Sequence, residues 1–458
     1  MVVIGAGPAG MAAAQELAAR DIDVALFDEQ PFSGGQIYRH ILNSPLDNPA
    51  VLGKDYAQGH RLAESIAETK IQYFPGASVW YLDDNRIIGV VKQDKSYQVS
   101  ADKIIIATGA QERPVPIPGW ELAGVMSAGA GQILMKSAAM IPSDGVVLAG
   151  SGPLLLLLAN QYLDAGVTVS AIVDTTSRFA LRSAIGNLPS AIPGMDYLLK
   201  GVRLLLRIKR AKIPVFKHST ELKLHGDAQV QGISFRSGES DHFLESRLVL
   251  LHQGVIPQLH LAQAAGCEVA WNQAQQCWHA KIDEWGQSSV PDIFVVGDGA
   301  KIMGAQASVA HGQLSAIQGG YELGKLTSSL RSSLSSKIRR RYIRHVAIRP
   351  FLDSFYAVPE AYLVPDDETM VCRCEEVKAG EIKKLARLGC MGPNQAKAFT
   401  RCGMGPCQGR MCGSVVEHII SRIGGQRMEH TGRYRSRPPV KPITLGQIST
   451  STESHAEY

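Results

Sequence analysis

Long apolar runs are missing from this chain of 458 residues. The longest, Leu154 to Ala159, is far shorter than the about 20 residues that span a bilayer, so the sequence predicts no transmembrane segment. Aromatic residues make up only 6% of the chain, and the net charge is only +5. The basic residues look scattered, apart from residues 337–349 and 427–441. An excess this small argues against nucleic-acid binding.

Cysteine is nearly absent outside one region. Six of the eight cysteines lie between Cys372 and Cys412, and only Cys267 and Cys277 lie elsewhere. This clustering excludes a secreted disulfide framework and favours reduced thiols in a cytoplasmic protein, with peripheral membrane association through partners left open. The two nucleotide-binding segments described next contain no C-x-x-C, which excludes a disulfide relay.

The N-terminus carries a dinucleotide-binding motif. Residues 2–10 read VVIGAGPAG, an apolar strand that runs into a glycine turn and then a helix. Glycines at this spacing permit a tight turn, a close pyrophosphate and close helix packing. The second strand ends at Asp28, where an acid binds ribose hydroxyls, and its position after the apolar run favours Asp28 over Glu29. The predicted contact residues are Gly5, Gly7, Pro8, Ala9, Gly10, Asp28 and Glu29.

Three further segments indicate that this dinucleotide is FAD. Residues 103–110 read KIIIATGA, residues 291–299 read PDIFVVGDG, and residues 34–36 read GGQ. In chain order, GGQ, KIIIATGA and PDIFVVGDG resemble the motifs of flavoproteins with two dinucleotide-binding domains, such as thioredoxin reductase and ferredoxin reductases. The resemblance implies that Asp298 binds the ribityl chain of FAD. It adds these residues to the predicted FAD site: Gly35, Gln36, Thr108, Gly109, Gly297 and Asp298.

A second nucleotide-binding unit lies between residues 118 and 290. It has a strand, Gly150 and Gly152, a helix, and a second strand that ends at Asp174. In the reductases this unit holds NAD(P)H, and Asp174 suits a ribose hydroxyl. Leu155 stands where a small residue is expected, so helix and strand cannot approach as closely. The unit therefore binds NAD(P), binds another adenine nucleotide, or is a scaffold that binds nothing.

The clustered cysteines predict a soft-metal site. VCRCEEV and TRCGMGPCQGRMC, each followed by a short helix, resemble the [2Fe-2S] module of bacterioferritin-associated ferredoxin. The resemblance covers about 50 residues and implies four ligands, with Cys402 a neighbour and Cys390 a packing residue. Zinc accepts the same four thiolates and is the rival ion. The predicted ligands are Cys372, Cys374, Cys407 and Cys412.

The fold class is therefore predicted as α/β, with two Rossmann-like dinucleotide-binding domains, one inserted in the other, and a small helical [2Fe-2S] domain at the C-terminus. Composition places a linker before this domain and a polar, partly disordered tail after it, with disorder expected beyond Pro438. The predicted divisions are 1–117 with 291–326 (FAD-binding), 118–290 (inserted NAD(P)-binding-like), 327–365 (linker), 366–425 ([2Fe-2S]) and 426–458 (tail).

Over nearly its whole length the chain resembles the α (A) subunits of opine oxidase, D-hydroxyproline dehydrogenase and hydrogen cyanide synthase. FDEQPFSGGQIYR and TRCGMGPCQGRMC carry this match. The resemblance implies an FAD-dependent oxidoreductase subunit that passes electrons through its cluster to a quinone or other acceptor. It implies a β subunit, similar to D-amino-acid and sarcosine oxidases, that oxidises the substrate C–N bond. It also implies a small ferredoxin-like γ subunit, with FMN at a subunit interface in some members.

Two other functions stay open at this point. One is a self-contained NAD(P)H-dependent flavin reductase that passes electrons through its cluster to a protein partner. The other is a redox-sensing or scaffold protein whose cysteine module binds zinc. The sequence shows no convincing acid–base set or nucleophile–base pair, so it identifies no catalytic residue.

Overall fold

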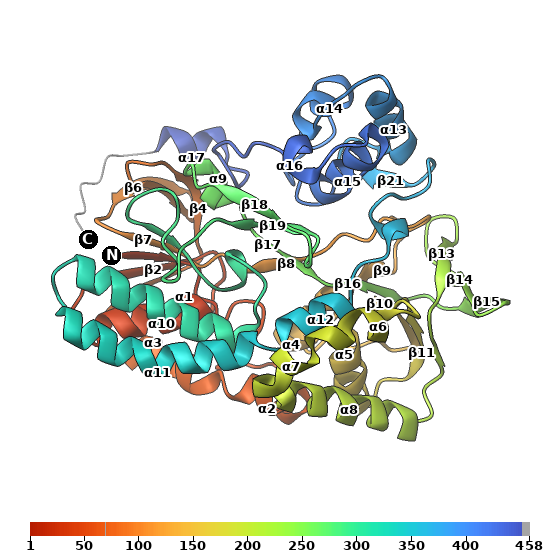
Figure 1. The fold of residues 1–458 in the computed structure, drawn as a ribbon, viewed down its shortest axis with the longest axis horizontal. Helices are drawn as coiled ribbons and strands as arrows, with labels where there is room; N and C mark the ends of the chain where they lie inside the picture. The colour runs from red at the N-terminus through yellow and green to blue at the C-terminus, as the bar shows by residue number, and fades with distance from the viewer. Residues whose placement is uncertain (69, 451–458) are drawn as a thin grey trace.

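The first fold is built on a parallel sheet that is buried on both faces. The computed structural model describes residues 1–68 and 70–450, and the strand order is β20-β7-β1-β2-β3. The strands are β1 (Val2–Ile4), β2 (Val24–Asp28), β3 (Ile71–Pro75), β7 (Ile104–Ile106) and β20 (Ile293–Val295). Strands β1 and β7 consist wholly of valine and isoleucine, as expected for strands covered on both sides. Because β20 comes from far along the chain, the sheet is completed only after the inserted segment (Figure 1).

Helices cover one face of this sheet, and a small antiparallel sheet covers the other. Helices α1 (Pro8–Ala18) and α10 (Ala305–Glu322) pack so closely that a Cβ on Gly312 would lie 2.1 Å from the carbonyl oxygen of Ala9. The other elements of this region are η1 (Pro49–Leu52), α2 (Lys54–Ala57), α3 (His60–Glu68), β4 (Ala77–Leu82), β5 (Ile87–Lys92), β6 (Lys95–Ser100) and η4 (Gly297–Gly299).

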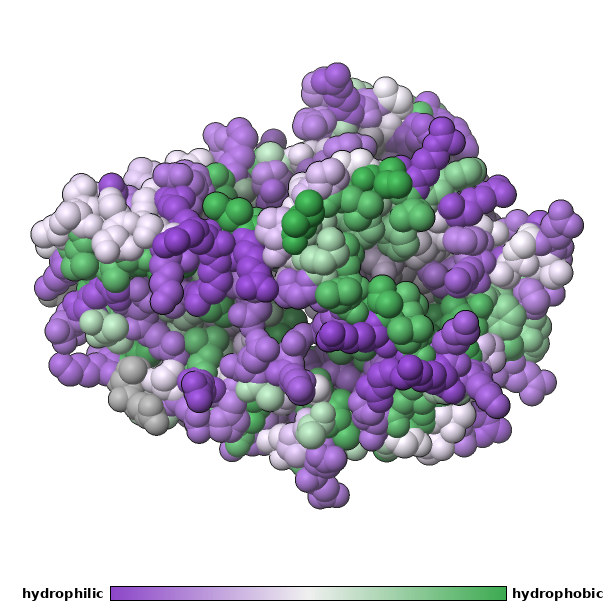
Figure 2. All heavy atoms as spheres, turned by 60° about the horizontal axis from the view of Figure 1, so that its bottom comes forward, coloured by the Kyte–Doolittle hydropathy of each residue, from purple (hydrophilic) through white to green (hydrophobic). Residues whose placement is uncertain are grey.

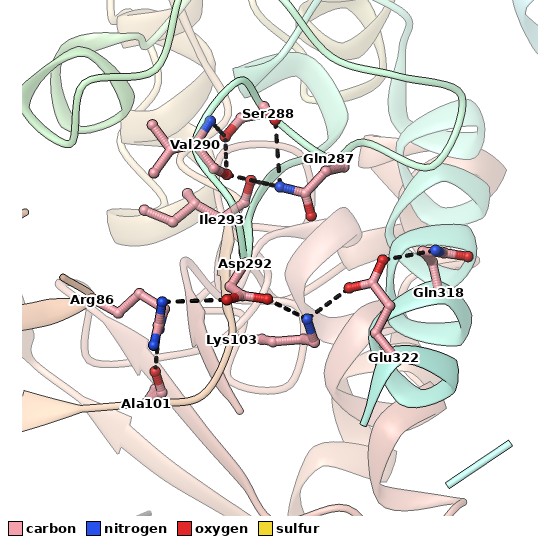
Figure 3. Close-up of polar contacts among 10 residues, drawn as sticks. All are labelled: Arg86, Ala101, Lys103, Gln287, Ser288, Val290, Asp292, Ile293, Gln318 and Glu322. Carbon is pink, nitrogen blue, oxygen red and sulfur yellow. Dashed lines mark hydrogen bonds and ion pairs between the residues drawn. The ribbon is translucent and has the colours of Figure 1, made fainter. Parts of the chain in front are cut away.

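A nearly buried lysine joins the edge of this sheet to α10 (Figure 3). The Nζ atom of Lys103 donates to Asp292 and, at 2.7 Å, to Glu322. Arg86, in the turn between β4 and β5, donates to the other oxygen of Asp292 at 3.2 Å. The network therefore fixes both β20 and α10 against β7.

The inserted segment repeats the parallel βαβ pattern, with strand order β12-β11-β10-β16-β9. Its strands are β9 (Val125–Ser127), β10 (Val146–Ser151), β11 (Val169–Asp174), β12 (Val215–Phe216) and β16 (Val249–Gln253). Its helices are α4 (Ala128–Ala138), α5 (Pro153–Asp164), α6 (Ala180–Ala184), η2 (Ile185–Asn187), α7 (Leu188–Ala191), η3 (Ile192–Gly194) and α8 (Met195–Arg210). A second, antiparallel sheet consists of β13 (Thr220–His225), β14 (Gly232–Ser237) and β15 (Ser240–Glu245).

The chain returns to the first fold earlier than its sequence indicates. Strand β17 (Val255–Pro257) pairs with β8 (Ala110–Glu112), and α9 (His260–Ala264) follows directly. Leu261 and Trp278 belong to the same apolar core as Ile4 and Phe27. The hairpin of β18 (Val269–Asn272) and β19 (Cys277–Ala280) continues this region. We therefore propose that the inserted domain ends near residue 255 rather than at 290.

The C-terminal part begins with a helical arm and ends in a small helical module on one side of the molecule (Figure 1). The arm contains α11 (Ser328–Val346), α12 (Arg349–Phe355) and η5 (Glu360–Tyr362). The module contains β21 (Met370–Cys372), β22 (Val377–Lys378), α13 (Ala379–Arg387), α14 (Pro393–Thr400) and α15 (Gly413–Gly424). Within residues 1–68 and 70–450, none of the helices has the length and apolar character needed to cross a bilayer.

The segment after this module is packed as far as the structure describes it, which corrects the expected disorder beyond Pro438. It contains α16 (Met428–Thr431) and α17 (Leu445–Ser449). The backbone N–H of Val440 donates to the carbonyl oxygen of Trp80 at 2.8 Å, and Lys441 pairs with Glu29 at 2.7 Å. These contacts offset the ordering entropy that a polar, proline-rich segment could not repay alone. Residues 451–458 lie outside the described residues.

Candidate functional site

The first glycine motif forms a tight loop at the carboxyl edge of the first sheet. Gly5 has φ +105°, and a Cβ there would lie 2.5 Å from the carbonyl oxygen of Ala107. A Cβ on Gly10 would lie only 1.8 Å from the carbonyl oxygen of Gly5. Gly7 has open space on its Cβ side except for the Cα of Gly35 at 3.8 Å. The loop therefore leaves its backbone accessible at the N-terminus of α1, as phosphate binding requires.

The two acids at the end of β2 have different surroundings. Asp28 is buried, and its carboxylate accepts the backbone N–H of Ala6 at 2.5 Å and that of Gln30 at 2.7 Å. Burial raises the pKa of Asp28, and these hydrogen bonds only partly oppose the shift. Glu29 is exposed and forms the ion pair with Lys441. Asp28 thus orders the glycine loop directly, while Glu29 lies at its rim.

Two buried cations support the loop that contains Gly35 and Gln36. Lys136, from α4, donates to the carbonyl oxygens of Gln36 at 3.2 Å and Ile37 at 2.9 Å. Burial, together with the nearby charge of Arg39, lowers the pKa of Lys136 to about 7. Within residues 1–68 and 70–450, the buried Nε of Arg39 has no hydrogen-bond partner. The sequence analysis missed both residues, although Arg39 stands three positions after the GGQ motif.

The remaining predicted FAD contacts converge on the same edge. Thr108 and Gly109 follow β7, and Gly297 and Asp298 follow β20 beside it. A Cβ on Gly109 would meet nothing within 4 Å. The Oδ1 atom of Asp298 accepts backbone N–H groups from Met303 at 2.7 Å and Gly304 at 2.8 Å. The glycine loop, the open face at Gly109 and two basic side chains, Lys136 and Arg39, that form no ion pair within residues 1–68 and 70–450 together fit an anionic dinucleotide such as FAD.

The second glycine motif is closed by the chain itself. Gly150 and Gly152 are both buried, and so are Ser151 and Thr175 beside them. Tyr362, from the linker, is only 5% exposed and hydrogen-bonds with Thr175.

The acid of this motif is half-buried. Asp174 accepts the backbone N–H of Thr176 at 2.9 Å. Burial, and next the charge of Asp174, raise the pKa of Tyr356 to about 12. Tyr362 packs in one apolar core with Ala149 and Val173, so the linker lies against the strands that end at this edge.

Five cysteines gather in the C-terminal module, in two adjoining groups. Cys372, Cys402 and Cys412 are buried, with sulfur atoms within 4.8 Å of one another. Hydrogen bonds from Cys402 and Cys412 hold the pKa of Cys372 far below its usual value. Cys374 is exposed and hydrogen-bonds with Cys407.

This grouping differs from the quartet predicted from the sequence. Cys372 lies with Cys412, and Cys374 lies with Cys407, but the buried group also contains Cys402, which was treated as a neighbour. Cys390 is buried in the module core and bonds to the carbonyl oxygen of Gly392 at 3.4 Å. Thiolates are the donors that iron–sulfur clusters and zinc prefer, so the two groups together fit such a centre.

The glycines around these cysteines make room for a tyrosine and for one thiol. Cβ atoms on Gly403, Gly409 and Gly413 would each lie within 3.3 Å of the ring of Tyr434. A Cβ on Gly405 would lie 2.2 Å from the Cβ of Cys374. Tyr434 belongs to the segment that the sequence analysis assigned to the tail, so local motifs gave no signal for its place beside the cysteines.

A chain of hydrogen bonds connects the two candidate sites. The Thr108 hydroxyl donates to the carbonyl oxygen of Gln258 at 3.0 Å, and the Gln258 side chain donates to Gln111 at 2.6 Å. The Gln111 amide then donates to the carbonyl oxygen of Arg410 at 2.8 Å. Arg410 lies between Cys407 and Cys412. The cysteine loop is thus docked directly on the strand that leaves the predicted FAD site.

Comparisons with known proteins identify the family. The profile described as pyridine nucleotide-disulphide oxidoreductase matches residues 1–313, and the sarcosine oxidase A3 domain profile matches residues 367–452. The α (A) subunit of opine oxidase from Rhizobium meliloti is 39% identical over 98% of this chain and 87% of the relative. Its counterpart from Agrobacterium tumefaciens (strain Ach5) is 40% identical over 98% and 91%. The chain belongs to the family of opine oxidase α (A) subunits.

Other relatives agree with this family placement. Hydrogen cyanide synthase subunit HcnB of Pseudomonas aeruginosa is 31% identical over 96% of both chains. The crystal structure of L-proline dehydrogenase from P. horikoshii shares the fold, with a TM-score of 0.71 over 98% of this chain and 78% of that chain at 17% identity. The predicted fold class, family and FAD-dependent oxidoreductase character are thereby confirmed. The individual ligand residues stay predictions.

Proposed function

We propose that this chain is the flavin and iron–sulfur electron-transfer subunit of a multi-subunit dehydrogenase that oxidises the C–N bond of an opine, hydroxyproline or a related amino acid. Substrate oxidation takes place in a partner β subunit similar to D-amino-acid and sarcosine oxidases. A ferredoxin-like γ subunit, an interfacial FMN and a quinone or other acceptor complete the proposed assembly. The names of the relatives, which are subunits of opine oxidase and hydrogen cyanide synthase, support this assignment.

The observation that carries this proposal is the hydrogen bond from Gln111 to the carbonyl oxygen of Arg410. It joins strand β8, which directly follows Thr108 and Gly109, to the loop that holds Cys407 and Cys412. A flavin accepts a pair of electrons and releases them singly, and an iron–sulfur cluster carries one electron at a time. The chain itself holds the predicted FAD site and the cysteine loop in contact and excludes water from around them.

Buried side chains support that contribution. Trp278, on β19, donates to the carboxylate of Glu417 on α15 at 3.1 Å. Glu417 is only 4% exposed, and burial raises its pKa to about 7. A low-dielectric contact of this kind strengthens electrostatic interactions between the two domains.

The closed second motif supports electron supply from a partner rather than from NAD(P)H. The linker residue Tyr362 is buried beside Thr175 and packs with Ala149 and Val173, at the end of the strands where a nicotinamide dinucleotide would bind. The self-contained reductase would require this linker segment to leave. We therefore expect NADH to leave the flavin oxidised.

The decisive experiment is anaerobic purification of this chain with its native partners, followed by flavin, iron and sulfide analysis. An opine or hydroxyproline should bleach the visible flavin absorbance of the complex, whereas the isolated chain should not respond. NADH should bleach neither sample. Reduction of the isolated chain by NADH would instead establish the reductase, and zinc without iron would establish the scaffold or sensor.

The ligand set needs a separate test, because five thiols are available for four positions. We propose Cys372, Cys374, Cys407 and Cys412 as the ligands. Single serine variants at these positions should lose the cluster's visible absorbance and iron, while Cys402→Ser and the matched control Cys390→Ser should keep both. If Cys402→Ser loses iron and Cys407→Ser retains it, the ligand set is wrong, although the proposed electron-transfer function can still hold.

A further inference from the structure

Helix α8 carries apolar residues on two opposite faces. Tyr197, Gly201, Leu204 and Ile208 recur at helical spacing on the less exposed face of the helix, and Ile208 is buried in an apolar core. On the opposite side, Met195, Leu199, Val202 and Leu206 follow the same i, i+4, i+7 pattern and are 40–53% exposed. An outward stripe of this kind contributes nothing to the core of the chain.

The segment that leads into α8 extends this surface. Phe179, Leu181, Ile185 and Ile192, from α6 and its flanking turns, are 57–64% exposed. In Figure 2 the bottom of Figure 1 comes forward, and hydrophobic side chains gather on that face, with strongly hydrophilic side chains beside them. Contiguous apolar surface of this extent on a folded chain marks an interaction site.

The same segment is strongly cationic, although the sequence analysis treated its basic residues as scattered. Between residues 178 and 212 there is one acidic residue, Asp196, against eight basic residues: Arg178, Arg182, Lys200, Arg203, Arg207, Lys209, Arg210 and Lys212. The chain carries +5 in total, so with +7 in this segment the remainder carries −2. This segment is therefore as cationic as residues 331–349, which also carry +7.

Most of this charge is not neutralised within the chain. Lys200 pairs with Asp55, and Arg207 pairs with Asp164 at 2.5 Å. Among residues 1–68 and 70–450, no ion pair is found for Arg203, Lys209 or Arg210. Arg203 and Arg210 lie on α8 directly beside the stripe of Met195 to Leu206, by helical spacing.

We propose that the outward face of α8, with the segment from Phe179 to Ile192, binds the surface of an anionic phospholipid bilayer. Leucine, valine and methionine side chains enter the boundary between headgroups and acyl chains, and flanking arginines and lysines remain at the anionic headgroups. The unpaired cations beside the apolar stripe support an anionic membrane, because amphipathic helices that lie on membranes combine such a stripe with flanking lysines and arginines. The negative surface potential of an anionic membrane attracts all eight basic side chains of this segment.

The position of this face separates it from the proposed electron-transfer contact. The cysteine module lies on the opposite side of the molecule from α8 (Figure 1). A chain bound through α8 therefore leaves the cysteine module accessible to other subunits. This inference does not depend on the proposed function.

The test is sedimentation of the full chain, in complex with any partner that co-purifies, with vesicles of phosphatidylglycerol and phosphatidylcholine or of phosphatidylcholine alone. We expect binding only to the anionic vesicles, with loss at high salt because the charges become screened. Leu199→Ser with Leu206→Ser should lower the vesicle-bound fraction about tenfold. Arg203→Gln with Arg210→Gln should weaken binding and flatten its salt dependence.

The matched control is Leu388→Ser with Phe399→Ser, which removes two exposed apolar side chains from the cysteine module. This control should bind vesicles like the unchanged protein, and all variants should keep their flavin absorbance and melting temperature. Absence of vesicle binding at low salt overturns the proposal, and so does equal binding by the Leu199/Leu206 variant. Loss of a co-purifying subunit from that variant, with vesicle binding unchanged, would make this face a protein interface instead.

Discussion

The two Rossmann-like folds of this chain have the same parallel architecture but differ at the edge where a nucleotide binds. In the first fold, Gly5 and Gly7 remain partly exposed, and Gly109 faces open space. In the second, Gly150 and Gly152 are buried. The difference does not come from the sheets, since both place a glycine loop between the first strand and the helix.

Two features of the chain produce the difference. The first is the third small position, which is Gly10 in one fold and the buried Leu155 in the other. The second is the linker, whose Tyr362 lies beside Thr175 and packs with Ala149 and Val173. A glycine motif therefore indicates a nucleotide site only when no other part of the chain covers it, and the cover here comes from nearly 200 residues further along.

The largest effect is expected from Gly10→Ala in the first fold. A Cβ there would lie 1.8 Å from the carbonyl oxygen of Gly5, a contact that backbone atoms cannot relieve without opening the glycine loop. FAD content per chain should fall below about one tenth of its usual value, because close helix–strand packing shapes the pyrophosphate site. Gly186→Ala is the matched control, since a Cβ at Gly186 meets nothing within 4 Å. Full FAD content in Gly10→Ala would show that the first fold is not the flavin site.

A smaller effect is expected from replacing Asp28, which ends the second strand of the first fold. No effect is expected from replacing Asp174, which ends the second strand of the second fold. Asp28→Asn keeps one carbonyl oxygen, so it cannot accept both backbone N–H groups, from Ala6 and Gln30, that the carboxylate accepts. Loss of one such hydrogen bond and of the predicted ribose contact should weaken FAD binding by about 1–3 kcal/mol. Asp174→Asn should leave FAD affinity unchanged. Equal losses in titrations of the two FAD-free variants would contradict the assignment of separate roles.

Much of the first site was predictable because its signals are local. The glycines, Asp28, and the Thr108–Gly109 and Gly297–Asp298 pairs each follow a short apolar strand, and parallel strands bring their carboxyl ends together. The boundary that we propose near residue 255 has no local signal in the sequence, because Leu261 and Trp278 look like ordinary core residues of either domain. Their packing against Ile4 and Phe27 supports it.

For the cysteine module too, the sequence identified the local motifs but not the contacts between distant segments. Its two loops were recognised from cysteine and glycine spacing, but their glycines fit around Tyr434, which lies outside the predicted module. Cys402 lies in the buried group because its own loop also carries Cys412 and because β21 brings Cys372 to both. Side-chain placement of this kind depends on contacts between distant segments, for which one sequence carries no local pattern.

A third prediction concerns Lys136, which belongs to the inserted segment but supports the first site. Burial lowers its pKa to about 7, whereas the unfolded chain keeps the ordinary value of 10.5. Between these values the unfolded state binds one more proton, so stability should rise with pH by about 1.4 kcal/mol per unit. Lys136→Met should remove this part of the slope in urea unfolding of the FAD-free chain between pH 7.5 and about 9.5. The exposed Lys337→Met is the control, and an unchanged slope in Lys136→Met would show that Lys136 stays charged.

The smallest effect tests what closes the second fold. Tyr362→Phe removes the hydroxyl group that bonds with Thr175 and should lower the free energy of unfolding by about 1 kcal/mol. Tyr73→Phe in β3 of the first fold is its counterpart. Within residues 1–68 and 70–450, the buried Tyr73 hydroxyl has no hydrogen-bond partner, so its removal should cost nothing measurable. Because the ring of Tyr362 still fills the nucleotide edge, calorimetry should detect no NADH or ADP binding to Tyr362→Phe. Binding by this variant would mean that one hydroxyl contact, rather than the packed linker, separates the second fold from a working nucleotide site.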